Sequence, residues 1–182
     1  RLIFDEIISN FLISSEIRKK IKKIKKKEKI FDSNICQKYL KKFKFILTND
    51  QIKAMKEINN DLKSKQRMFR LLQGDVGSGK TIIALIAALN VIKSGFQVAL
   101  MVPTEILAKQ HYNFASDLFG KDISIELLTG KTEYKQKKST LENIKQNKIK
   151  LIIGTHALFQ KKVDYKNLGL IIIDEQHKFG VR

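Results

Sequence analysis

The chain has 182 residues, of which 43% are hydrophobic, and carries a formal net charge of +18 with a pI near 9.9. This length supports one complete domain and a little more, and no apolar run reaches the ~18 to 20 residues of a membrane span, which argues against a membrane protein. With a lone cysteine, Cys36, and acids among its first residues, the chain predicts neither an intrachain disulfide nor a secretory signal, and we expect a cytoplasmic protein.

The first predicted element is a basic helix. Residues 2–24 place Leu, Ile and Phe at three- and four-residue spacings, and lysines fill the opposite face in its second half, which predicts an amphipathic helix. Two interpretations stay open: a basic arm that contacts nucleic-acid phosphates, or a solvated helix that links two domains. We interpret residues 1–42 as a basic helical connector and residues 43–182 as a separate domain.

Beyond the connector, strand and helix patterns alternate. Thr48 is the expected N-cap of a helix, because its hydroxyl can accept the N–H of Gln51. Strands are predicted at 68–73, 97–102, 123–128, 149–153 and 169–173, and further helices at 80–93, 104–118 and 133–147. Strands separated by helices of this length indicate right-handed crossovers. The expected fold is therefore α/β, with a parallel sheet covered by helices on both faces.

A phosphate-binding loop follows the first predicted strand. The pattern G-x-x-x-x-G-K-[ST] is matched by Gly74, Asp75, Val76, Gly77, Ser78, Gly79, Lys80 and Thr81. Glycines let the backbone wrap closely around phosphate oxygens and present N–H groups to them. Lys80 is expected to reach the β- and γ-phosphates, and Thr81 to ligate Mg²⁺. A Gly/Ser-rich turn without function is the alternative, but a strand before and a helix after the loop favour a nucleoside triphosphate site.

Two acids end the last predicted strand. Asp174 and Glu175 follow the apolar run at 170–173, and ligands bind at the carboxyl ends of strands in open α/β sheets. Asp174 is expected to hold the Mg²⁺ that bridges the β- and γ-phosphates, and Glu175 to orient and deprotonate the attacking water. Ordinary solvated acids are the alternative. A phosphate loop in the same chain favours a catalytic pair.

Together these motifs resemble those of superfamily 2 helicase motors, which are P-loop NTPases with RecA-like lobes. Longer strings resemble in particular the RecG family of ATP-dependent DNA helicases: LLQGDVGSGKT (71–81), VALMVPTEILAKQH (98–111), LLTGK (127–131), IIGTHALFQ (152–160) and IIIDEQHKFGV (171–181). The transcription-repair coupling factor shares this layout. Gln176, Ser78 and Ala157 distinguish the chain from its pattern and favour the RecG family.

The resemblance implies a helicase that uses ATP and Mg²⁺ to remodel branched DNA, such as stalled forks and Holliday junctions, in recombination and repair. The alternatives are a transcription-repair coupling translocase, and a nucleotide-dependent DNA-binding module without productive hydrolysis. The resemblance also implies a wedge domain before the connector and a second RecA-like lobe, to which no segment corresponds. An arginine finger from that lobe would be worth ~10³ to 10⁵ in rate. We therefore expect a monomeric fragment that is nearly inactive on its own.

The resemblance assigns roles to individual residues. It implies adenine recognition by Phe45 and by Gln51, whose amide matches the donor and acceptor of the base, and a coupling role near the γ-phosphate for His177. DNA-backbone contacts are implied for three motifs: Pro103, Thr104 and Glu105; Thr129 and Gly130; Gly154, Thr155 and His156. For the three threonines, helix or turn capping stays open beside the DNA role.

Overall fold

The computed structural model describes residues 15–16, 20, 24–32, 39–41 and 46–179. The chain forms two compact units, residues 1–30 with 48–83 and residues 31–47 with 84–182. Most of the predicted N-terminal helix and Phe45 lie outside the described residues, so the connector and the division at residue 42 stay predictions. None of the helices in the described part of the chain has the length and apolar character of a membrane span.

In the first unit, helix α3 (Asn49–Lys63) begins at the predicted cap. Thr48 Oγ1 accepts the N–H of Gln51 at 3.3 Å, and Gln51 Oε1 accepts the N–H of Thr48 at 3.0 Å. The two bonds form a capping box, which satisfies two N–H groups that the helix itself leaves unpaired. The apolar face of α3 is buried through Met55, Ile58 and Leu62. The predicted cap is confirmed.

The other end of α3 is capped by a lysine of the basic segment. Lys26 Nζ donates to Asp61 O at 2.7 Å and to Leu62 O at 3.1 Å. These carbonyls belong to the last turn, where a helix leaves its carbonyl oxygens unpaired and a cation is favoured. Burial, and then the charge of Lys29, lower the pKa of Lys26 to about 8. Lys26 of the basic segment therefore has a structural role, because it stabilises the end of α3.

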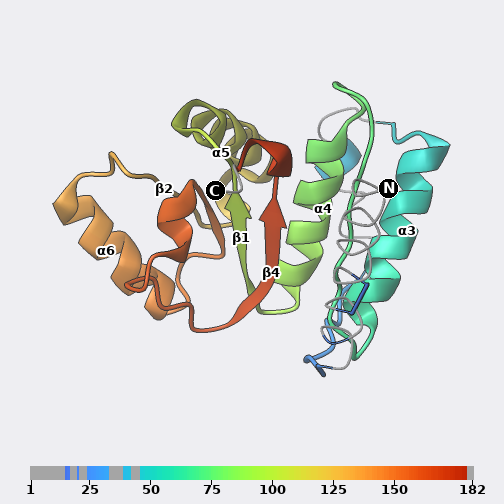
Figure 1. Cartoon of the computed structure of the whole chain (residues 1–182), viewed down its shortest axis with the longest axis horizontal. Helices are drawn as coiled ribbons and strands as arrows, with labels where there is room; N and C mark the ends of the chain where they lie inside the picture. The colour runs from blue at the N-terminus through green and yellow to red at the C-terminus, as the bar shows by residue number, and fades with distance from the viewer. Residues whose placement is uncertain (1–14, 17–19, 21–23, 33–38, 42–45, 180–182) are drawn as a thin grey trace, which may run out of the picture. The chain divides into compact units, whose positions relative to one another are not determined.

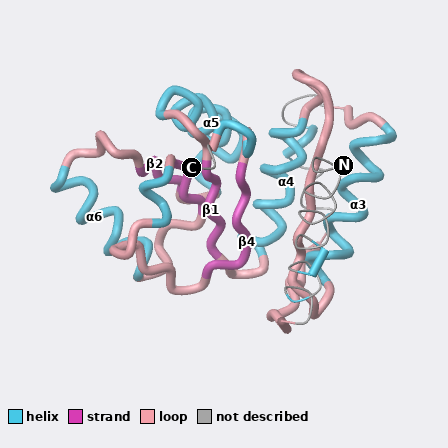
Figure 2. Tube along the Cα trace, viewed as in Figure 1, coloured by secondary structure: helices cyan, strands magenta, loops and turns pink. Residues whose placement is uncertain are grey.

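The predicted strand at 68–73 is wrong. The segment runs as a loop between α3 and α4 (Figure 2), and it forms no ladder with any strand that the structure describes. Arg70 ties it to α3 instead, donating to Glu57 Oε2 at 2.6 Å and to Asp61 Oδ2 at 2.8 Å. An apolar, extended sequence becomes a strand only where a partner edge accepts its backbone hydrogen bonds.

In the part of the second unit that the structure describes, four parallel strands form the sheet (Figure 1). They are β1 (Gln97–Met101), β2 (Ile125–Leu128), β3 (Leu151–Gly154) and β4 (Leu168–Ile173), in the spatial order β2-β3-β1-β4. Gly154 lies opposite both Met101 and Leu128, and Met101 also lies opposite Ile173. All four strands therefore end at one edge of the sheet. The α/β fold with a parallel sheet is confirmed, and each of these strands lies within two residues of its predicted position.

Three helices connect the strands and the loop: α4 (Lys80–Lys93), α5 (Glu105–Phe119) and α6 (Tyr134–Lys145). α4 is apolar on all sides, as a buried helix should be. α6 and the 3₁₀ turn His156–Phe159 cover one face of the sheet, in a cluster with Ala99, Leu128, Ile144, Ile152, Ala157 and Leu158. On the opposite face Val98, Leu100, Leu151 and Ile153 are buried, and α5 contacts β2 and β3. The predicted coverage of both faces is confirmed.

Glu126 is a carboxylate on a partly buried face of β2. It lies two residues before Leu128, on the face of β2 that meets the core cluster, and burial raises the pKa of its carboxyl above the ordinary value. Because the folded-state pKa exceeds the unfolded one, the group favours folding at low pH, and this contribution is lost as the pH rises through the folded-state pKa. At about pH 7 we expect Glu126→Gln to stabilise the protein by less than about 1 kcal/mol, since the side chain stays partly solvated.

Urea unfolding at two pH values measures this effect. At about pH 3 both forms of the protein carry a neutral side chain at this position, so the difference in the free energy of unfolding should vanish. Glu142→Gln, a change of an exposed carboxylate on α6, is the matched control. A Glu126→Gln variant that is less stable than the wild type at both pH values would contradict the burial account.

Candidate active site and DNA-binding edge

The phosphate loop of the first unit has the backbone shape that its glycines permit. Gly77 and Gly79 have φ angles of 79° and 80°, in the left-handed region that L side chains rarely adopt. A Cβ atom on Gly79 would also lie 2.5 Å from Gln51 Nε2. Lys80 begins α4 directly after the loop, so backbone N–H groups and the positive end of the helix dipole come together there. These residues fit a bound triphosphate.

Two side chains hold the loop in shape. Lys80 Nζ donates to Gly74 O at 2.8 Å and to Asp75 O at 2.6 Å, which places the ammonium group on the loop itself. Gln51 Nε2 donates to Ser78 O at 2.9 Å. The amide of Gln51 thus serves both the capping box of α3 and the phosphate loop. Its contact with adenine stays a prediction.

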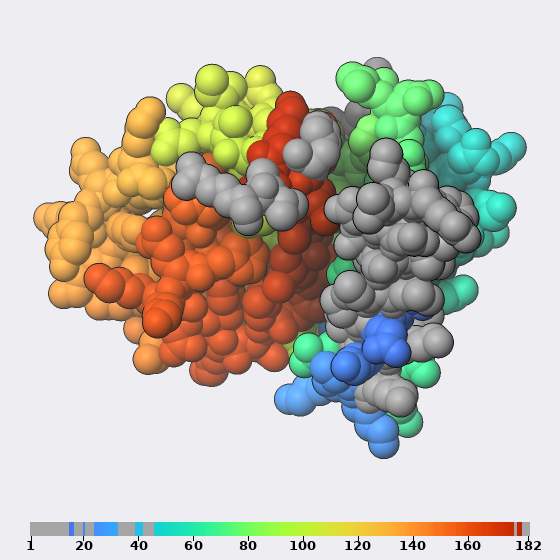
Figure 3. Space-filling model, in the orientation of Figure 1, coloured from blue at the N-terminus to red at the C-terminus, as the bar shows by residue number. Residues whose placement is uncertain are grey.

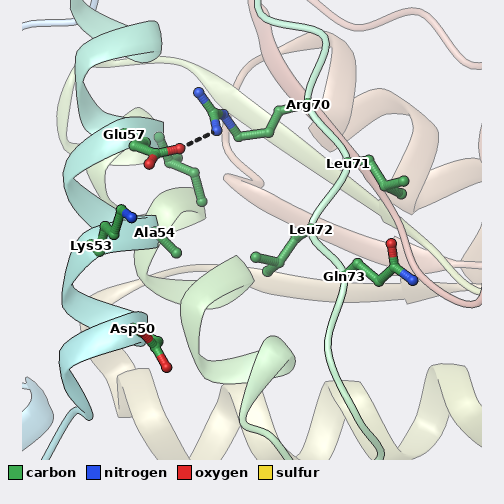
Figure 4. A pocket seen from close by; sticks show the side chains of 9 residues that line it. Asp50, Lys53, Ala54, Glu57, Arg70, Leu71, Leu72 and Gln73 are labelled. Atoms are coloured by element: carbon green, nitrogen blue, oxygen red, sulfur yellow. Dashed lines mark hydrogen bonds and ion pairs between the residues drawn. The ribbon is translucent and has the colours of Figure 1, made fainter.

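A separate pocket of about 240 Å³ lies in the first unit, between α3 and residues 70–73 (Figure 4). Its lining residues are Asp50, Lys53, Ala54, Glu57, Ile58, Arg70, Leu71, Leu72 and Gln73. Figure 4 shows Arg70 turned toward Glu57, and the guanidinium is also paired with Asp61. Because two carboxylates already balance this cation, the pocket is a poor site for an anion. The phosphate loop remains the better candidate.

The predicted DNA motifs and the acid pair gather at the carboxyl edge of the sheet in the second unit. The ladder continues just past the strand ends, since the N–H of Val102 donates to Gly154 O and the N–H of Asp174 donates to Met101 O, both at 2.9 Å. The segments that leave this edge begin at Pro103, Thr129, Thr155 and Asp174. Ligands of open α/β sheets bind at this edge. The acid pair lies at the end of its strand, as the sequence predicts, and the three DNA motifs follow the other strands at the same edge.

Both carboxylate oxygens of Asp174 have a polar contact. Its Oδ1 accepts the N–H of Glu175 at 3.0 Å, and its Oδ2 lies 2.9 Å from His111 Nε2. Sequence analysis did not identify this role for His111. A signal existed, because His111 shares the buried face of α5 with Ala108 and Ala115, and a polar group at a core position requires a partner.

Glu175 has an unusual backbone conformation. Its φ of 52° and ψ of 43° are left-handed, which costs free energy for a residue with a side chain and often occurs at functional sites. Its Oε2 lies 3.7 Å from Lys178 Nζ. The side chain is one-third exposed, so water can reach the carboxylate. His177 lies in the adjoining 3₁₀ turn Gln176–Lys178, and its coupling role stays a prediction.

An ion pair joins the first DNA motif to the residue that follows the second, at the carboxyl edge of the sheet. Thr104 caps α5, where its Oγ1 accepts the N–H of Leu107 at 3.3 Å. Glu105, the next residue, lies with Oε2 3.2 Å from Lys131 Nζ, and Lys131 follows Gly130. The capping role of Thr104 is confirmed, and its contact with DNA stays a prediction. Pro103 precedes the cap and is half-buried.

The other two threonines are buried. Thr129 and Thr155 are 6% and 3% exposed. The N–H of Thr129 donates to Thr132 Oγ1 at 3.0 Å, which closes the turn after β2. The Thr155 hydroxyl is buried without a hydrogen-bond partner among the residues that the structure describes. Neither threonine hydroxyl therefore has a capping bond among the described residues, and the contacts of both residues with DNA stay predictions.

Gly154 has a structural reason to be glycine. A Cβ atom at this position would overlap the carbonyl group of Leu128, so only glycine permits the close approach of β3 to β2 at the edge. Beside these buried positions, Gly130 and His156 are exposed. Thr104 of the first DNA motif is exposed as well.

Comparisons with known proteins agree with this geometry. The model of the DEAD/DEAH box helicase family matches residues 48–182. The ATP-dependent DNA helicase RecG of Aquifex aeolicus is 49% identical over 183 aligned residues, which cover 100% of this chain and 23% of that protein. RecG of Thermotoga maritima is 45% identical, with coverage of 100% and 24%. The chain thus spans about a quarter of the length of these curated relatives.

A solved structure is similar as well. It is described as RecG bound to a three-way DNA junction, and it matches with a TM-score of 0.84 and 45% sequence identity. The match covers 92% of this chain and 23% of that chain.

Proposed function

The chain belongs to the DEAD/DEAH box helicase family, and from this premise we propose that it is the first RecA-like motor lobe of an ATP-dependent DNA helicase that remodels branched DNA. The observation that carries the proposal is the gathering of the acid pair and three DNA motifs at one edge of one parallel sheet. Similarity to RecG over the whole chain supports branched DNA as the substrate. The proposed process is DNA recombination and repair.

In this proposal ATP is the substrate and Mg²⁺ the cofactor. When bound, Mg²⁺ neutralises charge that develops on the β- and γ-phosphates. The loop at 74–81 binds the phosphates through backbone N–H groups and Lys80. Thr81 and Asp174 are the proposed Mg²⁺ ligands, because Mg²⁺ prefers oxygen ligands and takes few of them from the protein. Glu175 orients the attacking water and accepts its proton.

The DNA backbone is proposed to follow the carboxyl edge of the second unit. Phosphate contacts position a protein on DNA without reading its sequence, and the net charge of +18 supports such contacts. The edge continues onto α6, since Lys137 Nζ donates to Gln160 Oε1 at 3.1 Å, and Figure 3 shows both segments in orange on adjoining parts of one surface. Gly130 and His156 are the proposed exposed contacts.

The proposal also includes parts beyond this chain. The resemblance supplies a second RecA-like lobe, which closes on ATP, and a wedge domain, to which residues 1–42 are the proposed connector. This chain spans about a quarter of the relatives' length, which supports the proposal that other domains of such proteins complete the motor. The complete motor, meaning this chain joined to those two domains, is proposed to act as a monomer in the cytoplasm.

The test is the dependence of ATP hydrolysis on DNA structure. We expect a synthetic three-way junction to raise the steady-state ATPase rate of the complete motor more than a linear duplex of the same composition. Junction and duplex giving equal stimulation would favour a transcription-repair coupling translocase. Nucleotide binding without any DNA-stimulated hydrolysis would contradict the helicase and favour a nucleotide-dependent binding module.

A further inference from the structure

We propose that His111 is a positioning residue for Asp174 and thereby sets the affinity of the motor for Mg²⁺. The inference deepens the proposed function and rests on it, because Asp174 is the proposed carboxylate ligand. It concerns an interaction between two elements, α5 and the end of β4, that are far apart in the sequence.

The geometry defines the orientation of the carboxylate. One oxygen, Oδ1, accepts the N–H of Glu175 at 3.0 Å, and the other, Oδ2, lies 2.9 Å from His111 Nε2. A backbone N–H on one oxygen and an imidazole nitrogen beside the other restrict the rotation of the group about its Cβ–Cγ bond. The backbone beneath it is held too, since the N–H of Asp174 donates to Met101 O at 2.9 Å. Removing His111 would release the only one of these three contacts made by another side chain.

The surroundings of His111 make its contribution rigid. Its side chain is 11% exposed, whereas that of Asp174 is 31% exposed. Ala108 and Ala115, one turn before and one turn after it on α5, are fully buried. The imidazole is therefore held in the packed interior of the unit, while the carboxylate it contacts remains open to solvent. This is the arrangement expected when a buried group aims a ligand at a site.

The chemistry allows one oxygen to serve both partners. An ionised carboxylate has about four lone-pair positions on its two oxygens, so an imidazole N–H and a metal ion can share it. Hydrogen-bond partners of this kind orient metal ligands, and their loss typically costs about 10- to 100-fold in metal affinity or activity. A histidine that merely fills the core would instead affect stability alone.

The experiment compares three substitutions in the complete motor. His111→Leu keeps much of the apolar volume and removes the donor, His111→Gln keeps an N–H donor, and Asn113→Ala changes an exposed residue of the same helix. Binding of a fluorescent, non-hydrolysable ATP analogue is measured as a function of Mg²⁺ concentration, without turnover. Thermal unfolding of each variant is measured in parallel, so that a loss of folding is recognised as such.

We expect His111→Leu to raise the Mg²⁺ concentration for half-maximal binding by about 10- to 100-fold. His111→Gln should recover most of that loss, and Asn113→Ala should match the wild type. The positioning role is refuted if His111→Leu needs the same Mg²⁺ concentration as the wild type for half-maximal binding, or a lower one. It is also refuted if His111→Gln is folded but as impaired as His111→Leu. In both cases the proposed function stands. A wild-type protein without Mg²⁺-dependent nucleotide binding would refute both.

Discussion

Glu175→Gln should abolish ATP turnover in the complete motor while leaving nucleotide binding intact. The substitution keeps the size of the side chain and its capacity for hydrogen bonds, but an amide cannot accept the proton of the attacking water. General acid–base catalysis contributes typically 10² to 10⁴ in rate, so we expect kcat to fall by about that factor. Loss of the ion pair with Lys178, 3.7 Å away and largely exposed, should add little.

The position of Glu175 makes this prediction specific. Its backbone is held in the left-handed region, and its N–H donates to Asp174 Oδ1 at 3.0 Å. Neither feature involves the side-chain carboxylate, so the substitution should leave the backbone of the acid pair in place. Steady-state ATPase rates with a saturating DNA junction measure turnover, and titration with a fluorescent ATP analogue measures binding.

Glu142→Gln is the matched control for this experiment. It removes one carboxylate from an exposed position on α6 in the same unit, and it should leave both turnover and binding unchanged. ATPase rates that are equal for the wild type and Glu175→Gln would refute the assignment of the base. A variant that also loses nucleotide binding would show that Glu175 supports the site in another way.

Much of the fold follows from local patterns that depend on no distant partner. α4 begins and ends at the predicted residues, Lys80–Lys93, because a run that is apolar except for Asn90 follows the phosphate loop and Ser94-Gly95 ends it. β3 is an apolar and fully buried run, as a strand within a parallel sheet should be. β4 is an apolar run too, although its Ile171 and Ile173 are each 46% exposed. In such segments the spacing of apolar residues indicates the type of element, and the flanking residues indicate where it begins and ends.

The segment at 68–73 shows where this reasoning fails. Its residues have the composition of a strand, yet a strand exists only as part of a ladder, and the choice of partner is a tertiary property. In the structure the guanidinium of Arg70, bound to Glu57 and Asp61 of α3 at 2.6 and 2.8 Å, decides the local arrangement. Composition and periodicity do not reveal that the segment folds back to make this pairing.

The candidate site also has one part that the sequence predicts and another that only the tertiary structure determines. Parallel strands must bring their carboxyl ends to one edge, so the sequence alone could predict that the segments starting at Thr129, Thr155 and Asp174 would converge. The contact between His111 and Asp174 depends on how α5 is rotated over the sheet, which packing determines. The left-handed backbone of Glu175 is likewise invisible in a sequence, because most left-handed residues are glycine or asparagine.

Lys80→Ala should weaken nucleotide binding by about 10- to 100-fold, the equivalent of the ~1.5 to 3 kcal/mol that a hydrogen bond to a charged group contributes. The ammonium group of Lys80 lies on the phosphate loop, where its Nζ donates to Gly74 O at 2.8 Å and to Asp75 O at 2.6 Å. A small rotation of this side chain would exchange loop carbonyls for phosphate oxygens. Alanine removes that charge-assisted contact and leaves the backbone N–H groups of the loop to bind alone.

Lys93→Ala is the matched control, because it removes one positive charge from the other end of the same helix at an exposed position. Lys80→Arg separates charge from shape, since arginine keeps the charge but presents a planar fork in place of a compact ammonium group. Affinity for the fluorescent ATP analogue is measured by titration, with thermal unfolding as a check on the loop. Equal affinity of Lys80→Ala and wild type would refute the phosphate contact. If Lys93→Ala lowered the affinity for the analogue as much as Lys80→Ala does, the loss would be explained by net charge alone. Weak binding in Lys80→Ala, with wild-type binding in Lys93→Ala and partial recovery in Lys80→Arg, is the pattern that only a placed ammonium group explains.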